Sequence, residues 1–142
     1  VIIRASTLLH ARLTIAGEPA LAGDAEYLRK LKTLGGDVNF IGKVAQSNLP
    51  DLYRSHDIFV HASKTGSLDK ALLEAMACGM KVVSCNDAAR GFLPASWIFA
   101  PDDAQELAEK IRHHHAENFD VRQYVVEHHD LKKLIEKISS QL

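Results

Sequence analysis

One stretch decides the fold of this chain: Gly66-Ser67-Leu68-Asp69-Lys70-Ala71-Leu72-Leu73-Glu74-Ala75-Met76-Ala77-Cys78-Gly79-Met80-Lys81-Val82-Val83. It predicts a polar loop, a short helix with one apolar face, a glycine stop and a buried strand. The apolar face consists of Leu72, Leu73, Ala75 and Met76, and Gly79 supplies the left-handed residue that often follows a helix. A glycine-containing loop that runs into a helix N-terminus is a ready site for a phosphate group.

Three charged residues lie on this predicted helix or next to it. Asp69 precedes the helix, and we expect its side chain to cap the free N–H groups. Lys70 falls in the first turn, where the helix dipole disfavours a cation, so an anion between the lysine and the helix end would explain its position. Glu74 follows one turn later on the same face. An ordinary exposed ion pair between Lys70 and Glu74 is the alternative, and spacing alone favours that alternative.

Short apolar segments alternate with helix-like segments along the whole chain. Strands are predicted at residues 13–16, 38–41, 58–62, 82–85 and 97–99, and further helices at 24–34, 47–55, 103–115 and 130–142. Near-continuous apolar strands are typical of a parallel sheet that is covered on both faces. The sequence therefore predicts a single α/β domain over residues 1–142, with a doubly wound parallel sheet.

The composition excludes several classes of function. The 142 residues carry a net charge of −1, and 46% of them are hydrophobic. A near-neutral chain without a basic stripe does not suit nucleic-acid binding, and no apolar run approaches the roughly 20 residues that cross a membrane. Cys78 and Cys85 lack the spacing of zinc or redox motifs, and neighbouring histidines on a helix cannot converge on one ion. We expect a cytoplasmic protein without a metal site.

The opening stretch resembles the donor-site signature of the retaining GT-B glycosyltransferases (the group 1 family), E-G-F-G-L-x-x-L-E-A-x-A-x-G-x-P-V-V. Three more blocks resemble the same family, in its order and at its spacing. They are Leu13–Glu18 (family L-x-I-x-G-x-G), Val38–Val44 (V-x-F-x-G-x-V) and Leu49–Ser63 (L-x-x-L-Y-x-x-A-D-x-F-V-x-P-S). Any single block would be weak, but the ordered set over about residues 5–116 is specific.

This resemblance implies a Rossmann-like GT-B C-terminal domain that binds a nucleotide-diphosphate sugar as substrate, without a metal or other cofactor. It implies that backbone N–H groups around Asp69, Lys70 and Ala71 face the diphosphate, that Glu74 accepts hydrogen bonds from the ribose, and that the backbone of Lys43 and Val44 meets the base. The donor-binding residues implied in this way are Gly17, Lys43, Val44, Gly66, Ser67, Leu68, Asp69, Lys70, Ala71 and Glu74. No residue of this chain is assigned a catalytic role.

The chain departs from the family pattern in two places. The first glutamate of the motif, which contacts the donor sugar, is replaced by Gly66, and this puts the sugar specificity or the activity in question. Upstream of Val1, the acceptor domain, the basic G-R-x-x-x-x-K-G segment and the first strand of the sheet are missing. The absence of that strand should leave a slot with unpaired backbone groups in the sheet. Either another chain fills the slot, or Val1–Arg4 occupies it as a makeshift strand, or the chain is a fragment of a longer protein. We favour the fragment. Such a fragment is expected to be inactive alone, to self-associate through the slot, and to reach membranes only through absent regions.

Two other functions remain open at this point. A nucleotide- or phosphosugar-binding module without catalysis is favoured by Gly66 and by the missing basic segment. A sugar-nucleotide epimerase of GT-B shape is weaker, because Leu73–Gly79 resembles the transferases more closely.

Overall fold

The computed structural model describes residues 1–19, 24–114 and 118–130. Within this part of the chain, four short strands form two separate parallel pairs. Strand β1 (Leu13–Ala16) pairs with β2 (Val38–Gly42), and β3 (Ile58–His61) pairs with β4 (Lys81–Ser84). The helices α2 (Asp24–Lys32) and α4 (Lys70–Ala77) lie in the two crossovers, as parallel strands require.

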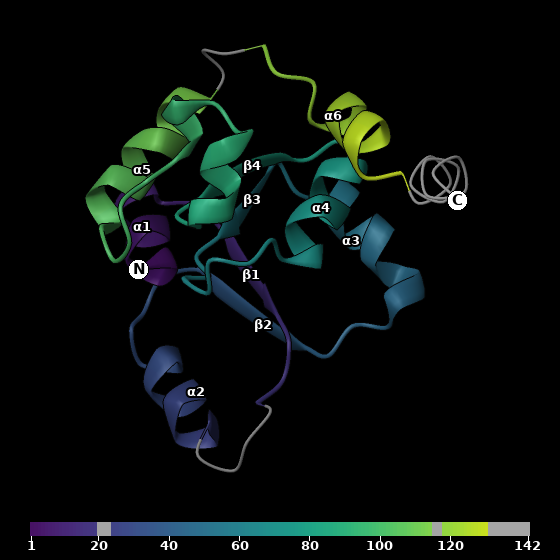
Figure 1. Cartoon of the computed structure of the whole chain (residues 1–142). Helices are drawn as coiled ribbons and strands as arrows, with labels where there is room; N and C mark the ends of the chain where they lie inside the picture. Colours follow the sequence, from purple (N-terminus) through teal and green to yellow (C-terminus); the bar gives the residue numbers. More distant parts are fainter. Residues whose placement is uncertain (20–23, 115–117, 131–142) are drawn as a thin grey trace.

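The other helices lie around these two pairs (Figure 1). They are α1 (Ile2–Leu9), α3 (Leu49–Arg54), α5 (Ala104–His113) and α6 (Val121–His128). Short 3₁₀ turns occupy Gln46–Asn48, Asp87–Gly91 and Ala95–Trp97. Helix α1 packs on α5, and α4 packs on α6. The helix predicted at 130–142 lies almost wholly outside the described residues, as does His115 at the end of the one predicted at 103–115.

The parallel α/β fold is confirmed, but one predicted strand is wrong. Residues 97–99 do not form a strand, since Trp97 ends a 3₁₀ turn and its N–H donates to the carbonyl of Pro94. Only Ile98 forms a bridge, to Ser84, and the N–H of Phe99 donates to the Ser84 carbonyl at 3.1 Å. Because Trp97 belongs to the 3₁₀ turn, it cannot extend this contact into a strand.

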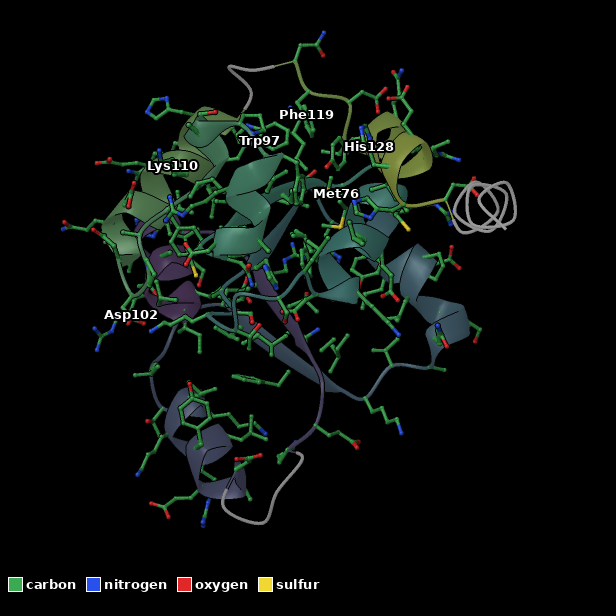
Figure 2. All side chains as sticks on the ribbon, in the orientation of Figure 1. Met76, Trp97, Asp102, Lys110, Phe119 and His128 are labelled. Atoms are coloured by element: carbon green, nitrogen blue, oxygen red, sulfur yellow. The ribbon has the colours of Figure 1, made fainter. Side chains whose placement is uncertain are left out.

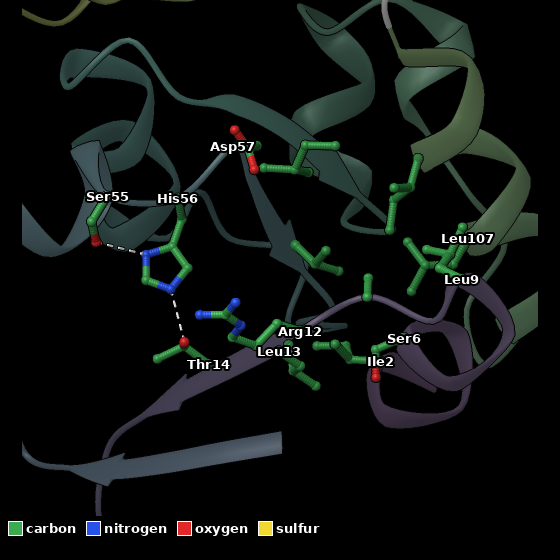
Figure 3. A pocket seen from close by; sticks show the side chains of 14 residues that line it. Ile2, Ser6, Leu9, Arg12, Leu13, Thr14, Ser55, His56, Asp57 and Leu107 are labelled. Carbon is green, nitrogen blue, oxygen red and sulfur yellow. Dashed lines mark hydrogen bonds between the residues drawn. The ribbon is translucent and has the colours of Figure 1, made fainter. Parts of the chain in front are cut away.

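The slot expected in the sheet is present as a groove between β1 and β3. Among the described residues each of these strands pairs with one other strand, so their facing edges have no strand partner there. Between them lies a cavity of about 490 Å³, with α1 and α5 as further walls (Figure 3). A side-chain hydrogen bond crosses the groove, joining His56 Nε2 to Thr14 Oγ1 at 2.7 Å. Strands β1 to β3 are mostly half-buried, so the predicted cover on both faces holds only at β4.

Val1–Arg4 does not fill this groove as a strand. Residues from Ile2 onward form α1 instead, with Ile3 and Ala5 buried. The guanidinium of Arg112 in α5 donates to the carbonyl of Leu8 near the end of α1, at 3.1 Å. The apolar spacing at Ile2, Ala5 and Leu9 is better satisfied by a helix packed on α5 than by an edge strand. The alternative of a makeshift strand is therefore wrong.

Two apolar clusters form the core. The first surrounds α4 and includes Leu72, Met76, Val82 and Trp97, all without exposed surface. The second joins α1 and α5 to β4 through Ala5, Val83, Cys85, Phe99, Leu107 and Ala108. The apolar face predicted for this helix is confirmed, with Leu73 half-buried against the first cluster and the other members buried: Leu72, Ala75 and Met76. Of the helices in the described part of the chain, none has the length and apolar character of a membrane span.

We expect the groove to drive self-association, because its edges offer unpaired backbone and half-buried apolar side chains. In sedimentation experiments the average mass of residues 1–142 should rise with concentration. The substitution Leu13→Lys places a charge on the groove wall and should reduce association. The control Ile41→Lys adds the same charge on β2, away from the groove. A stable monomer of wild-type protein at high concentration would count against this prediction.

Candidate functional site

Helix α4 is delimited by the residues that the sequence indicates. Gly66 has φ 73° and Gly79 has φ 83°, a region that side chains strongly disfavour. At the helix end the N–H of Gly79 donates to the Met76 carbonyl and the N–H of Met80 to that of Ala75. These two bonds form a Schellman motif, so the predicted glycine stop is confirmed. The loop before α4 turns at Gly66, in a backbone conformation that would be strained for a residue with a side chain.

Asp69 is the N-cap residue of α4, but its side chain makes no capping bond. Its Oδ2 instead accepts a hydrogen bond from Nε2 of His61, at the end of β3, over 2.7 Å. This bond, followed by one from Ser63, lowers the pKa of the Asp69 carboxyl below its ordinary value. The prediction that the Asp69 carboxylate caps the helix is therefore wrong, because a tertiary partner takes it.

Lys70 and Ala71 form the exposed first turn of α4. Lys70 makes no ion pair with Glu74, although both residues lie in the described part of the chain. The simple alternative of a surface Lys70–Glu74 pair is thus not what the structure shows. In the described part of the chain Lys70 has no ion-pair partner, and no side chain caps the N–H groups at the start of α4, an arrangement that favours an anion.

Glu74 has a different partner, which comes from α3. The hydroxyl of Tyr53 donates to Glu74 Oε2 at 3.3 Å. Burial, with the charge of Glu74 as the next cause, raises the pKa of Tyr53 to about 12. The bond occupies one carboxylate oxygen and leaves Oε1 as an acceptor for a ligand.

A cleft of about 530 Å³ joins these groups to the other strand pair. It shares walls with the groove at β1 and β3 and continues to α4. Of the predicted site residues, Gly17, Lys43, Val44, Ala71 and Glu74 line it. The first three come from the ends of β1 and β2, and the last two from α4. The cleft therefore spans both strand pairs.

The other predicted site residues lie before α4 and outside the lining of this cleft. They are Gly66, Ser67, Leu68, Asp69 and Lys70. Leu68 packs against the core cluster around α4, so its side chain has a structural role. Gly66, Ser67 and Lys70 are exposed at the helix entrance. The binding role of all ten residues stays a prediction.

Sequence reasoning did not identify Tyr53, His61 and Asn86 as parts of this region. Tyr53 lines the cleft, and Asn86 donates from its amide to the Ser67 carbonyl at 3.0 Å. The sequence signal for Tyr53 was its place in the L-x-x-L-Y block. His61 and Asn86 gave none, since each acts on a loop that only the fold brings near. Among the described residues, no cluster of His, Cys, Asp and Glu is arranged to hold a metal ion.

The buried Tyr53–Glu74 contact predicts an alkaline loss of stability. The unfolded chain releases the tyrosine proton near the ordinary value of 10.0 and the folded protein near 12, so the folded state holds more protons in between. Stability should therefore fall as pH rises through this window. Melting curves of Tyr53→Phe should show a shallower fall than wild type. Tyr27→Phe, at a side chain 63% exposed, should not, and equal slopes in all three proteins would contradict the prediction.

Comparisons with known proteins agree with this fold. The profile of the family "Glycosyl transferases group 1" matches residues 1–117. The solved catalytic domain of cholesterol-alpha-glucosyltransferase from Helicobacter pylori superposes with a TM-score of 0.69 at 24% identity, covering 88% of this chain and 84% of that one. At this identity the likeness shows the α/β fold with its parallel strands.

Curated relatives match over part of their length. The chain is 30% identical over 105 residues to the sulfoquinovosyl transferase SQD2 of Arabidopsis thaliana, covering 66% of this chain and 20% of that protein. It is 32% identical over 73 residues to the phosphatidylinositol N-acetylglucosaminyltransferase gpi3 subunit of Schizosaccharomyces pombe, covering 51% and 16%. It is 36% identical over 70 residues to the uncharacterized glycosyltransferase MJ1069 of Methanocaldococcus jannaschii, covering 45% and 18%. The chain thus spans about a fifth of the length of these relatives.

Proposed function

This chain belongs to the glycosyl transferases group 1 family, and on that premise we propose that it is the donor-binding half of a retaining glycosyltransferase. The donor is a nucleotide-diphosphate sugar, and the group transferred is a hexosyl unit. The observation that carries the proposal is the cleft of about 530 Å³, which is lined by Glu74 from α4 and by Lys43 and Val44 from the end of β2.

The cleft suits the parts of a nucleotide. An ionised carboxylate only accepts hydrogen bonds, so Glu74 suits the hydroxyls of a ribose. Tyr53 donates to Oε2 of this carboxylate, so Oε1 is left as an acceptor for a ligand. Lys43 and Val44 follow Gly42, whose backbone is left-handed with φ 69°, and both residues line the cleft. The base would meet the backbone there.

The phosphates would bind at the start of α4. Breaking the glycosidic bond leaves charge on the diphosphate, and free N–H groups with a nearby cation stabilise that charge. The N–H groups of Lys70 and Ala71 and the ammonium of Lys70 supply these groups. The reaction proposed in this way needs no metal ion. A cytoplasmic location, where nucleotide sugars are made, is part of the same proposal.

Gly66 bears on the second candidate, a nucleotide-binding module without catalysis. No side chain at Gly66 can contact a donor sugar, and nothing lies within 4 Å of a Cβ placed there. Release of nucleotide in the presence of acceptor, measured on the longer protein, distinguishes a transferase from a binder. Residues 1–142 alone should bind donor and transfer no sugar.

The proposal predicts a specific effect of Lys70→Ala. Calorimetric titration of residues 1–142 with UDP, GDP and ADP, and with the matching nucleosides, first identifies the base. The substitution should then weaken diphosphate binding by about threefold to tenfold at low salt, and less at high salt, because salt screens exposed charges. Nucleoside affinity should stay the same.

The control for this experiment is Arg122→Ala. Arg122 is also an exposed cation in the first turn of an eight-residue helix, α6, and it does not line the cleft. Equal losses in the two variants would mean that net charge, not a phosphate site at α4, causes the effect. A wild-type chain that binds none of the diphosphates would refute the proposed function.

A further inference from the structure

A buried network of hydrogen-bonded polar side chains, formed by His61, Ser84 and Asn86, lies next to the loop that enters α4. His61, at the end of β3, is 6% exposed, Ser84, at the end of β4, is 0% exposed, and Asn86 is 1% exposed. His61 Nδ1 lies 3.0 Å from Ser84 Oγ, and the N–H of Asn86 donates to the same oxygen at 3.0 Å. Burying three polar side chains is unfavourable unless they are all bonded, as they are here.

The direction of these bonds follows from what each group can donate. A carboxylate cannot donate, so His61 Nε2 carries the proton and donates to Asp69 Oδ2. In the neutral ring Nδ1 then has no proton, and the Ser84 hydroxyl donates to it. The buried network therefore offers Asp69 one donor, the Nε2–H of His61.

The same buried network is hydrogen-bonded to the loop at two points. Asn86 donates from Nδ2 to the carbonyl of Ser67 at 3.0 Å, and His61 holds the side chain of Asp69 at 2.7 Å. Both anchors come from the carboxyl ends of neighbouring parallel strands. The loop from Gly66 to Asp69 is thus fixed to the sheet on either side of Leu68.

Holding Asp69 has a consequence for α4. Asp69 has the extended backbone of an ordinary N-cap, φ −76° and ψ 137°, yet its carboxylate makes no cap bond. In most helices such a carboxylate accepts from the second or third N–H, here that of Ala71 or Leu72. Leu72 already donates to the Asp69 carbonyl, which leaves the N–H of Ala71 as the group that the carboxylate would cover.

We propose that His61 is a positioning residue for phosphate binding, which withdraws the Asp69 carboxylate from the start of α4 and keeps that helix end open to an anion. This inference rests on the proposed function and adds a residue outside the cleft to it. Without His61, the carboxylate would cap α4, cover the N–H of Ala71 and repel a phosphate. Helix α4 thus lacks the side-chain cap that Asp69 could provide, and its N-terminal N–H groups stay open to an anion.

The first test needs no ligand, and its Asp69→Ala variant leaves the buried bonds among His61, Ser84 and Asn86 intact. In Asp69→Ala, amide hydrogen exchange of Ala71 should match that of the wild type, because the wild-type carboxylate does not protect this N–H. In His61→Leu the exchange of Ala71 should slow, because the carboxylate is released to cap the helix. Faster exchange of Ala71 in Asp69→Ala would show that Asp69 already caps α4 and would overturn the inference.

The second test uses UDP, GDP and ADP with their nucleosides. His61→Leu should weaken diphosphate binding by about fivefold, the equivalent of a typical cap bond, and leave nucleoside binding unchanged. The double variant His61→Leu/Asp69→Ala should recover the lost affinity. A loop that is merely disordered would not recover, and that outcome would overturn the inference. Adding Ser63→Ala to His61→Leu removes the second bond to Asp69 and should enlarge the loss.

The two tests separate this inference from the proposed function. If no diphosphate binds, the proposed function fails, and the exchange of Ala71 still decides whether His61 withdraws Asp69. If diphosphates bind and His61→Leu changes neither the exchange nor the affinity, the positioning role is wrong and the donor site stands. Should His61→Leu fail to fold, Asp69→Ala decides the question in the native protein.

Discussion

Replacing Trp97 with alanine should lower the free energy of unfolding by about 3–5 kcal/mol, the usual range for a large buried aromatic side chain. Trp97 has no exposed surface and belongs to the core cluster around α4. Its ring meets that of Phe119 edge to face, with the centroids 5.7 Å apart (Figure 2). The loss should remove a large share of the roughly 5–15 kcal/mol that stabilises an ordinary domain, and chemical denaturation monitored by circular dichroism measures it.

A second substitution separates packing from polarity at this position. The Trp97 Nε1–H is buried and has no acceptor among the described residues, an unfavourable arrangement that Trp97→Phe removes. This variant should lose less than half of what Trp97→Ala loses. The exposed control Tyr27→Ala should change stability by no more than about 0.5 kcal/mol. Equal losses in Trp97→Phe and Trp97→Ala would contradict the packing explanation.

Replacing Glu74 with glutamine should weaken the binding of nucleoside and nucleoside diphosphate alike by about 1–3 kcal/mol, the range for a hydrogen bond to a charged group. The shape is kept, and a glutamine oxygen can still accept from Tyr53. The loss should fall on ribose contacts, so removal of the phosphates should not change it. This contrasts with Lys70→Ala, whose effect requires the diphosphate.

The control for Glu74→Gln is Glu109→Gln, the same change at an exposed position of α5 away from the cleft. Calorimetric titration compares the two variants with wild type, and thermal melting confirms that both are folded. Unchanged affinity in Glu74→Gln would remove Glu74 from the site and leave it as the partner of Tyr53 alone.

Local signals were enough to predict most of the fold. The apolar runs at 13–16, 38–41, 58–62 and 82–85 fall within one residue of β1 to β4 at either end. Gly79 ends α4 through its own backbone geometry, so no distant residue was needed to predict it. Trp97 was misassigned because its apolar neighbours suggest a strand, whereas the turn after Pro94 takes its N–H.

The site was less predictable, because its side chains choose among partners that lie far apart in the sequence. Asp69 has the residue type and position of a helix cap, but His61 from the neighbouring strand binds its carboxylate. Glu74 has the spacing for a pair with Lys70, but Tyr53, 21 residues away, binds it. Spacing and residue propensity predict only interactions between residues that are close in the sequence. In both cases the fold brings in a different hydrogen-bond partner, which replaces the predicted local one.

The division of the strands into two pairs also bears on how the chain closes on itself. Each parallel pair joins residues roughly 25 positions apart, whereas the bond from Arg112 to Leu8 spans 104. Loop-closure entropy grows with the logarithm of loop length, so docking α1 on α5 costs about 1 kcal/mol more than forming either pair. Strand pairing cannot offset this cost directly, because α1 and α5 are both helices. The apolar contacts that Ala5, Ile2 and Leu9 make with the second cluster offset this cost, together with the Arg112 bond.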